Sequence, residues 1–328
     1  MKIFVTGATG FVGSHIADKL FTLGHEIRCT IRSSSNLRWL TGKPFELVQC
    51  SLFDKEALKE AVSGVDYIFH AAGLTSAKNL NEFMQGNCEG TMNLIQAATQ
   101  NASNLKRFLY ISSQAAAGPS ESKENPKTES MPDNPITSYG ISKKAAEEVV
   151  MSFSNQIPVT IVRPSAVYGP RDTEIFQIFK SVKMGLGTIV GFNKKYLNLV
   201  HSEDVARGAV EAAFSGQTTG KKYFLSSEEF YSWDFLIDTI KRGLGKKYVL
   251  KLKLPHFVVL GAGAISGAIG KFSDKPPVFN YEKSIDFIQN YWTCSVEKAK
   301  QDFGYRQKIS AVQGITDTIR WYRDNHWL

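Results

Sequence analysis

The chain has 328 residues, of which 43% are hydrophobic and 21% charged, and its composition excludes a disordered or low-complexity protein. This length allows a large core with a smaller appended lobe. The formal net charge of +8 could serve nucleic acid, a membrane surface or an anionic ligand, but Lys and Arg are spread along the chain. We therefore interpret the excess mainly as solvated surface that also attracts a phosphorylated cofactor, and we expect no nucleic acid partner.

The first 24 residues read as a strand, a glycine-rich turn and a helix. Lys2 to Thr6 is a short apolar run typical of a buried strand, and Gly7-Ala8-Thr9-Gly10-Phe11-Val12-Gly13 follows with three glycines three residues apart. Glycines let the backbone approach a diphosphate, and free N–H groups at a helix start donate to its negative charge. This context predicts a dinucleotide site, with a tight connection that binds nothing as the alternative. The candidate contacts are Gly7, Thr9, Gly10, Phe11 and Val12.

Strands and helices alternate along the rest of the first half. We expect further strands at residues 26–31, 45–49, 65–69, 108–111 and 159–162, a helix at 54–62, and a return to the sheet at 222–225. This alternation predicts a doubly wound parallel α/β sheet of the Rossmann type, which binds ligands beyond the carboxyl ends of its strands. We assign residues 1–170 and 196–227 to a dinucleotide-binding domain, and residues 171–195 and 228–328 to a smaller substrate-binding lobe.

A serine, a tyrosine and a lysine form the candidate catalytic group. Tyr139 and Lys143 are four residues apart in a stretch of helical composition, so they share one helix face. A nearby ammonium favours the phenolate and lowers a phenol's pKa from about 10, which suits proton exchange with a substrate oxygen held by Ser113. Each feature alone is commonly a surface pattern or a turn. Their order after the glycine turn favours a hydride-transferring oxidoreductase.

With these motifs the chain resembles the extended short-chain dehydrogenase/reductase superfamily along essentially its whole length. The matching segments are residues 6–13, 70–73, 87–91, 112–113, 139–143 and 163–170. The resemblance implies that Ser113, Tyr139 and Lys143 are catalytic and that Lys143 also holds the nicotinamide ribose. It further implies a supporting role for Asn87 and cofactor contacts from Ala71, Ala72, Gly73, Pro164 and Val167.

Two differences from the sugar-nucleotide enzymes of the superfamily indicate which branch the chain resembles. Gln114 and Ala115 replace the acidic pair of sugar-nucleotide dehydratases, and residues 279–286 lack the arginine that epimerases bring to a sugar diphosphate. The chain looks instead like the dihydroflavonol reductase and 3β-hydroxysteroid dehydrogenase-like branch, which interconverts a carbonyl and a secondary alcohol on a largely apolar molecule. A nucleotide-sugar epimerase is the alternative enzyme. A dinucleotide-sensing protein without turnover is the alternative of another class, although such sensors commonly lack the Tyr and Lys found here.

The end of the second strand bears on the cofactor. Residues 28–38 contain no acid to bind the ribose of NAD, whereas a cation there accommodates a 2′-phosphate. We predict NADP(H), with Arg32 as the main phosphate partner and Arg38 as a weaker one; NAD(H) is possible if Arg32 points into solvent. Ser51, followed by Leu52, takes the place of an aspartate that contacts adenine in the family, so this contact is expected to lack a charge.

The remaining expectations concern location and assembly. The four cysteines form no CxxC pair and have no companion histidines, so we expect no metal site, reduced thiols and a cytoplasmic protein without a signal peptide. The apolar window 257–270 is shorter than the roughly 18 to 20 residues of a spanning helix. We interpret it as a buried or amphipathic helix, with peripheral membrane contact as a minor option. The resemblance also suggests a homodimer through two helices, one at residues 87–99 and one that begins at Tyr139. The first helix carries small and apolar residues that permit such a contact, namely Leu94, Ile95, Ala97 and Ala98.

Overall fold

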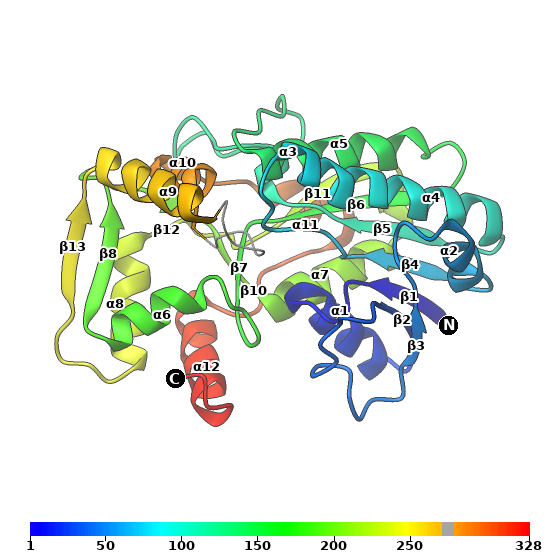
Figure 1. The fold of residues 1–328 in the computed structure, drawn as a ribbon, viewed down its shortest axis with the longest axis horizontal. Helices are drawn as coiled ribbons and strands as arrows, with labels where there is room; N and C mark the ends of the chain where they lie inside the picture. Colours follow the sequence, from blue (N-terminus) through cyan, green and yellow to red (C-terminus); the bar gives the residue numbers. More distant parts are fainter. Residues whose placement is uncertain (271–278) are drawn as a thin grey trace.

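A seven-stranded parallel sheet forms the centre of the computed structural model, which describes residues 1–270 and 279–328 (Figure 1). Its strand order is β11-β6-β5-β4-β1-β2-β3. From β1 the chain adds β2 and β3 on one side and then β4, β5, β6 and β11 on the other, and sheets of this kind bind ligands at that switch point between β1 and β4. The predicted doubly wound fold is confirmed. The strands are β1 (Lys2–Thr6), β2 (Glu26–Ile31), β3 (Glu46–Gln49), β4 (Tyr67–His70), β5 (Arg107–Ile111), β6 (Val159–Pro164) and β11 (Lys221–Leu225).

Both faces of this sheet are covered by helices, because successive residues of the central strands point to opposite sides and nearly all are apolar. In β1, Ile3 and Val5 belong to the core under one helical layer, and Phe4 belongs to the other. The first layer holds α1 (Phe11–Thr22), α7 (Ser202–Phe214) and α11 (Glu297–Phe303); the second holds α2 (Lys55–Val62), α4 (Gly90–Asn101) and α5 (Ser138–Ser152) (Figure 1). Short helical pieces complete this part: α3 (Leu80–Phe83), a π-helical turn at Met84–Glu89, and 3₁₀ turns at Gln114–Ala116 and Gly216–Thr218.

A third core lies beyond the carboxyl edge of the sheet. It packs around small sheets in which β10 pairs with β7, β9 with β12 and β14, and β13 with β8. The strands are β7 (Ala166–Tyr168), β8 (Leu186–Val190), β9 (Tyr196–Leu197), β10 (Leu199–His201), β12 (Tyr231–Ser232), β13 (Leu250–Leu254) and β14 (Tyr291–Trp292). The helices are α6 (Phe176–Lys183), α8 (Trp233–Gly243), α9 (His256–Gly270), α10 (Tyr281–Ile288) and α12 (Ala311–Asp324).

Two expectations about helices need correction. The window 257–270 does form a helix, but the expectation of a buried or amphipathic one is wrong, because its exposed positions are themselves apolar. The four residues that permitted a dimer through α4 are at most 4% exposed and pack in the core beneath it. They are Leu94, Ile95, Ala97 and Ala98, so an interface on α4 would have to use other side chains.

Candidate active site

The turn between β1 and α1 needs its glycines. Gly7 has φ +74°, and a Cβ on it would lie 2.6 Å from the backbone nitrogen of Ala72. A Cβ on Gly13 would lie 2.2 Å from the carbonyl oxygen of Gly7. No side chain of the described residues caps α1 at Gly10, which leaves the N–H groups of its first turn for an anion. The turn therefore fits the diphosphate of a dinucleotide, with Thr9, Phe11 and Val12 half-buried around it.

The end of β4 is fixed beside this turn by buried hydrogen bonds. Thr6 Oγ1 lies 2.7 Å from His70 Nδ1 and accepts from the backbone N–H of Ala72 at 3.2 Å. Burial lowers the pKa of His70 to about 3, so the ring stays neutral. A Cβ on Gly73 would lie 2.8 Å from Asn87 Oδ1. Glycine at this position thus lets the chain after β4, with Ala71 and Ala72, run along the cofactor side of the sheet.

The two predicted arginines have different surroundings. Arg32 follows β2, and both it and Arg38 are exposed. Arg38 stacks instead on indole rings, with its guanidinium carbon 4.3 Å from the ring centroid of Trp39 and 5.4 Å from that of Trp327. Arg32 is therefore the more available of the two cations.

The remaining predicted cofactor contacts lie on both sides of the switch point. The hydroxyl of Ser51 accepts from the backbone N–H of Phe53 at 3.2 Å, so it already serves a turn. Leu52 packs against the start of α4, where a Cβ on Gly90 would lie 3.1 Å from its Cδ1. Pro164 ends β6 and is buried, and Val167 is half-buried in β7 opposite Val200.

The Ser113 hydroxyl lies close enough to the Tyr139 phenol to lower its pKa. Ser113 follows β5 and its Oγ also accepts from the backbone N–H of Ala115 at 3.1 Å, while Tyr139 is the second residue of α5. Burial raises the pKa of Tyr139, and the hydrogen bond with Ser113 lowers it by less. Burial thus dominates the pKa of this phenol in the chain itself, and an acidifying effect of Lys143 stays a prediction.

Lys143 is buried one turn further along α5. Its Nζ donates to the carbonyl oxygen of Ile111 at 2.8 Å and lies 4.3 Å from the ring centroid of Tyr110. Burial lowers the pKa of Lys143 to about 7, although Glu147 opposes the shift. A Cβ on Gly73 would lie 3.9 Å from this Nζ, so the ammonium lies next to the cofactor side of β4.

Asn87 ties the same loop to the catalytic helix. Its Oδ1 accepts from the backbone N–H of Leu74 at 2.6 Å, and its Nδ2 donates to Ser142 Oγ at 2.9 Å. Ser142 in turn donates to the carbonyl oxygen of Tyr139 at 2.8 Å. Asn87 therefore fixes the position of Tyr139 through the backbone of α5.

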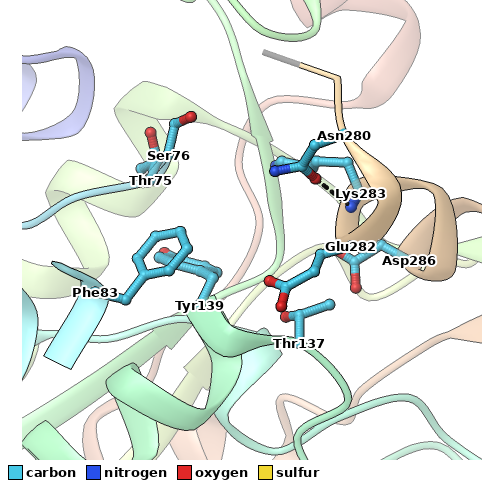
Figure 2. A pocket seen from close by; sticks show the side chains of 9 residues that line it. All are labelled: Thr75, Ser76, Phe83, Thr137, Tyr139, Asn280, Glu282, Lys283 and Asp286. Atoms are coloured by element: carbon cyan, nitrogen blue, oxygen red, sulfur yellow. Dashed lines mark hydrogen bonds between the residues drawn. The ribbon is translucent and has the colours of Figure 1, made fainter. Parts of the chain in front are cut away.

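A pocket opens beside Tyr139 and is closed on its far side by α10 (Figure 2). The ring of Phe83 lies 5.9 Å from that of Tyr139, centroid to centroid. Glu282 of α10 accepts from the backbone N–H and the hydroxyl of Ser138, at 3.0 and 2.5 Å, which fastens α10 to the start of α5. The lining residues are Thr75, Ser76, Phe83, Thr137, Tyr139, Asn280, Glu282, Lys283 and Asp286.

This pocket carries charges that sequence reasoning missed. Lys283 donates to Glu174 at 3.1 Å. Asp286 Oδ1 is buried without a hydrogen-bond partner among the described residues, and burial raises the pKa of its carboxyl to about 7 against the attraction of Lys283. Residues 279–286 were considered only for the absence of an arginine. Nothing in their spacing indicated that α10 would face Tyr139.

The sequence model of the NAD dependent epimerase/dehydratase family matches residues 3–232. The chain belongs to this family. A ceramide reductase of Caulobacter vibrioides is 29% identical and aligns with 99% of this chain and 96% of its own length. A decarboxylating sterol-4-alpha-carboxylate 3-dehydrogenase of Dictyostelium discoideum is 25% identical, over 96% and 99%. The crystal structure of gox2253 superimposes with a TM-score of 0.82 and 30% identity over 99% of this chain and 98% of that one.

The predicted resemblance is confirmed, and this family member is an NAD(P)-dependent oxidoreductase of the extended short-chain type. Solved dehydratases with bound NAD share its fold; one from Bacillus anthracis has a TM-score of 0.80 at 20% identity. At that identity the likeness concerns the fold alone.

A buried ion network beneath α5 of this family member was also not predicted from the sequence. Arg163 is fully buried and donates to both carboxylate oxygens of Glu147, at 2.8 and 2.5 Å, and to Asp133 at 2.7 Å. Lys222 Nζ lies 2.9 Å from Glu147, and Ser112 donates to the same carboxylate at 2.5 Å. The one feature of the sequence that could have indicated this network is Glu147, one helical turn after Lys143. The network fixes α5, and with it Tyr139 and Lys143, against β6.

Proposed function

We propose that this oxidoreductase interconverts a carbonyl and a secondary alcohol on a small, largely apolar substrate, with NADP(H) as the preferred cofactor and Ser113, Tyr139 and Lys143 as catalytic residues. The observation that carries the proposal is the Tyr139 phenol beside a pocket, with the Ser113 hydroxyl near enough to lower its pKa and the Lys143 side chain one turn away. Two hydroxyl groups this close can both reach one substrate oxygen.

Each residue has a separate task in the proposed reaction. The glycine turn at Gly7 to Gly13 holds the diphosphate, and Lys143 holds the ribose beside Gly73. When bound, the nicotinamide dinucleotide supplies or accepts the hydride. Ser113 holds the substrate oxygen, and Tyr139 donates its proton to that oxygen during reduction and takes it back during oxidation. Because burial raises the pKa of Tyr139, its phenol holds at neutral pH the proton that reduction requires.

The preference for NADP(H) rests on Arg32. Its side chain is exposed directly after β2, and residues 28–38 contain no carboxylate to compete for it or to bind a free ribose hydroxyl. Arg38 has a weaker claim because its guanidinium stacks on Trp39.

The apolar substrate class is inferred from the names of relatives, and the placement of its polar part from the pocket. The relatives include a ceramide reductase, a sterol dehydrogenase and a ketoreductase of a farnesylated quinoline oxide from Stigmatella aurantiaca, the last 27% identical. Phe83 offers an apolar wall beside Tyr139, and Lys283 with Asp286 offers polar contacts. We therefore propose a lipid-like ketone or alcohol whose polar part lies under α10.

The division into domains and the assembly are proposals as well. The third core supports a separate substrate lobe, for which we propose residues 171–195 and 228–328; within this range α11 packs on the central sheet instead. A cytoplasmic homodimer through α4 and α5 would use exposed side chains such as Ile141, which is 41% exposed.

The decisive experiment measures NADPH oxidation with a panel of steroid-like, flavonoid-like, long-chain and short aliphatic ketones. We expect turnover of at least one long-chain or polycyclic ketone. Tyr139→Phe should lower kcat by about 10²- to 10⁴-fold, because it removes the proton donor, and should leave NADPH affinity unchanged. Tyr248→Phe is the matched control, since Tyr248 is 75% exposed. Undiminished turnover in Tyr139→Phe would show that another group is the acid.

A further inference from the structure

The outward face of α9 is apolar, unlike that of an ordinary surface helix. Nine of its fifteen residues are exposed. Eight of these nine are apolar or glycine, and the ninth is His256. Phe257 is 74% exposed, Ile265 64% and Ile269 67%. By contrast, the exposed residues of α2 are all charged. A helix that is apolar on its outward side needs an apolar environment there.

The opposite side of α9 is firmly packed, so this exposure does not come from a loosely attached segment. A Cβ on Gly263 would lie 2.8 Å from the carbonyl oxygen of Asn280 and from Ser284 Oγ. Ser266 donates to the carbonyl oxygen of Phe279 at 2.7 Å. Both contacts join α9 to α10 and the residues that precede it, and α10 closes the pocket beside Tyr139.

The apolar surface continues onto neighbouring segments. Phe192 is 68% exposed in the loop after β8, and a Cβ on the adjacent Gly191 would lie 2.5 Å from His256 Nε2 at the start of α9. Leu250 and Leu252 of β13, the strand directly before α9, are 52% and 44% exposed. Figure 1 shows β8, β13 and α9 together at one end of the molecule.

This end of the molecule is also strongly basic. Residues 175–202 and 239–270 together carry ten Lys and Arg residues and no Asp or Glu. The parallel pairing of β8 with β13 brings the two segments side by side, which a reading along the chain did not reveal. Lys194, Lys247 and Lys253 are exposed. Lys251 is held by Asp234 and Asp238 of α8, at 2.9 Å each.

We propose that α9 and the Phe192 loop dock on the surface of a bilayer that contains anionic lipids. Apolar side chains enter the interface, and the surrounding lysines meet the headgroups. The fifteen residues of α9 measure about 22 Å, less than the roughly 30 Å of a hydrocarbon core, so the helix lies on the membrane. No helix of the described chain is long and apolar enough to cross one.

Charge favours a membrane over a second copy of the chain as the occupant of this face. A two-fold interface would bring the same basic segments of both copies together, and like charges disfavour that contact. Docking through α9 also sets the pocket behind α10 next to the bilayer. If the proposed function holds, an apolar substrate enters from the membrane without crossing water.

The test is co-sedimentation with phosphatidylcholine vesicles, with and without phosphatidylglycerol. We expect binding that is stronger to the anionic vesicles. The double variant Ile265→Glu and Ile269→Glu should weaken binding to both vesicles by at least about a hundredfold, because each buried isoleucine contributes about tenfold or more. Val312→Glu is the matched control, since Val312 is 49% exposed on α12. Lys247→Glu with Lys253→Glu should weaken binding only to anionic vesicles, by about fivefold per lysine.

Two outcomes would overturn the proposal. One is equal vesicle binding by the parent and the double isoleucine variant. The other is a dimer in light scattering without vesicles that the same variant abolishes, because the face would then belong to a second copy. Turnover of a water-soluble ketone keeps the two proposals apart: the double variant should retain it. Vesicle binding without any turnover would support docking and contradict the proposed function.

Discussion

Two of the charge clusters in the described chain accommodate their charge differently. Beneath α5, the buried Arg163 meets Glu147 and Asp133 at 2.8 Å or less, and only its Nη1 and Asp133 Oδ1 lack a partner among the described residues. Under α10, Asp286 keeps a buried oxygen without a partner among the described residues, and its pKa is raised to about 7. A paired charge fixes two elements together, whereas an incompletely paired one costs stability and is available to a ligand. The contrast separates the scaffold that positions Tyr139 from the surface that meets the substrate.

The largest effect is expected where the paired charges are broken. Glu147→Gln leaves Arg163 buried with one carboxylate fewer, and it should lower the free energy of unfolding by about 3–5 kcal/mol. Urea denaturation followed by circular dichroism measures this loss. Glu148→Gln, at the exposed neighbouring position of α5, is the control and should change little. Equal stability of the two variants would mean that the network contributes nothing to holding α5.

A smaller effect is expected at the glycine turn, the part of the scaffold that meets the cofactor. Gly13→Ala places a methyl group 2.2 Å from the carbonyl oxygen of Gly7, so the turn has to shift. Such overpacking costs about 1–3 kcal/mol, and we expect NADPH to bind about ten- to a hundredfold more weakly by fluorescence titration. Gly216→Ala is the control, because a Cβ there meets no atom within 4 Å. Unchanged affinity in Gly13→Ala would contradict the assignment of this turn to the diphosphate.

Arg32 allows a second test of cofactor binding, at an exposed cation in the dinucleotide-binding part of the chain. Arg32→Ala should weaken NADPH binding about tenfold and leave NADH binding unchanged, because only NADPH carries the 2′-phosphate. Arg38→Ala should have a smaller effect, since its guanidinium stacks on Trp39. The measurement is the ratio of the two dissociation constants. Equal constants in the parent protein would remove Arg32 from the cofactor site.

The sequence predicted the glycine turn and the helix that carries Tyr139 far better than the charged groups packed around them. The strand at 2–6, the glycine turn and the pair Tyr139 and Lys143 are local patterns, and each gives the position of its element without reference to the rest of the chain. The parallel sheet then brings Ser113, which follows β5, to the edge where α5 begins with Tyr139.

What the sequence could not predict depends on contacts between distant segments. Lys283 and Asp286 face Tyr139 only because α10 returns over the start of α5, more than a hundred residues away in the chain. The network around Arg163 joins residues 133, 147, 163 and 222, which share no spacing rule. The same holds for α9, whose apolar composition reads as a buried helix until the structure shows which side is covered.

The smallest expected effect lies at Asp286, and its sign is opposite to that at Glu147. The pKa of Asp286 is raised from 3.8 to about 7, so the folded chain binds the proton more tightly than the unfolded chain does. Stability from this group is therefore complete below pH 3.8 and is lost as the pH rises towards 7. The groups that face Asp286 are Lys283, which attracts its charge, Glu282 and Glu174, which repel it, and Tyr139.

Asp286→Asn keeps the shape of the side chain and removes the charge. We expect the variant to match the parent near pH 4 and to exceed its free energy of unfolding by about 1 kcal/mol at pH 8, a modest gain because Lys283 loses one of its two neighbouring carboxylates. Urea denaturation at the two pH values measures the difference. Asp317→Asn, on the exposed side of α12, should show no such dependence. If Asp286→Asn lowered stability at pH 8, this carboxylate would be a paired scaffold charge like Glu147, and the distinction between the two regions would fail.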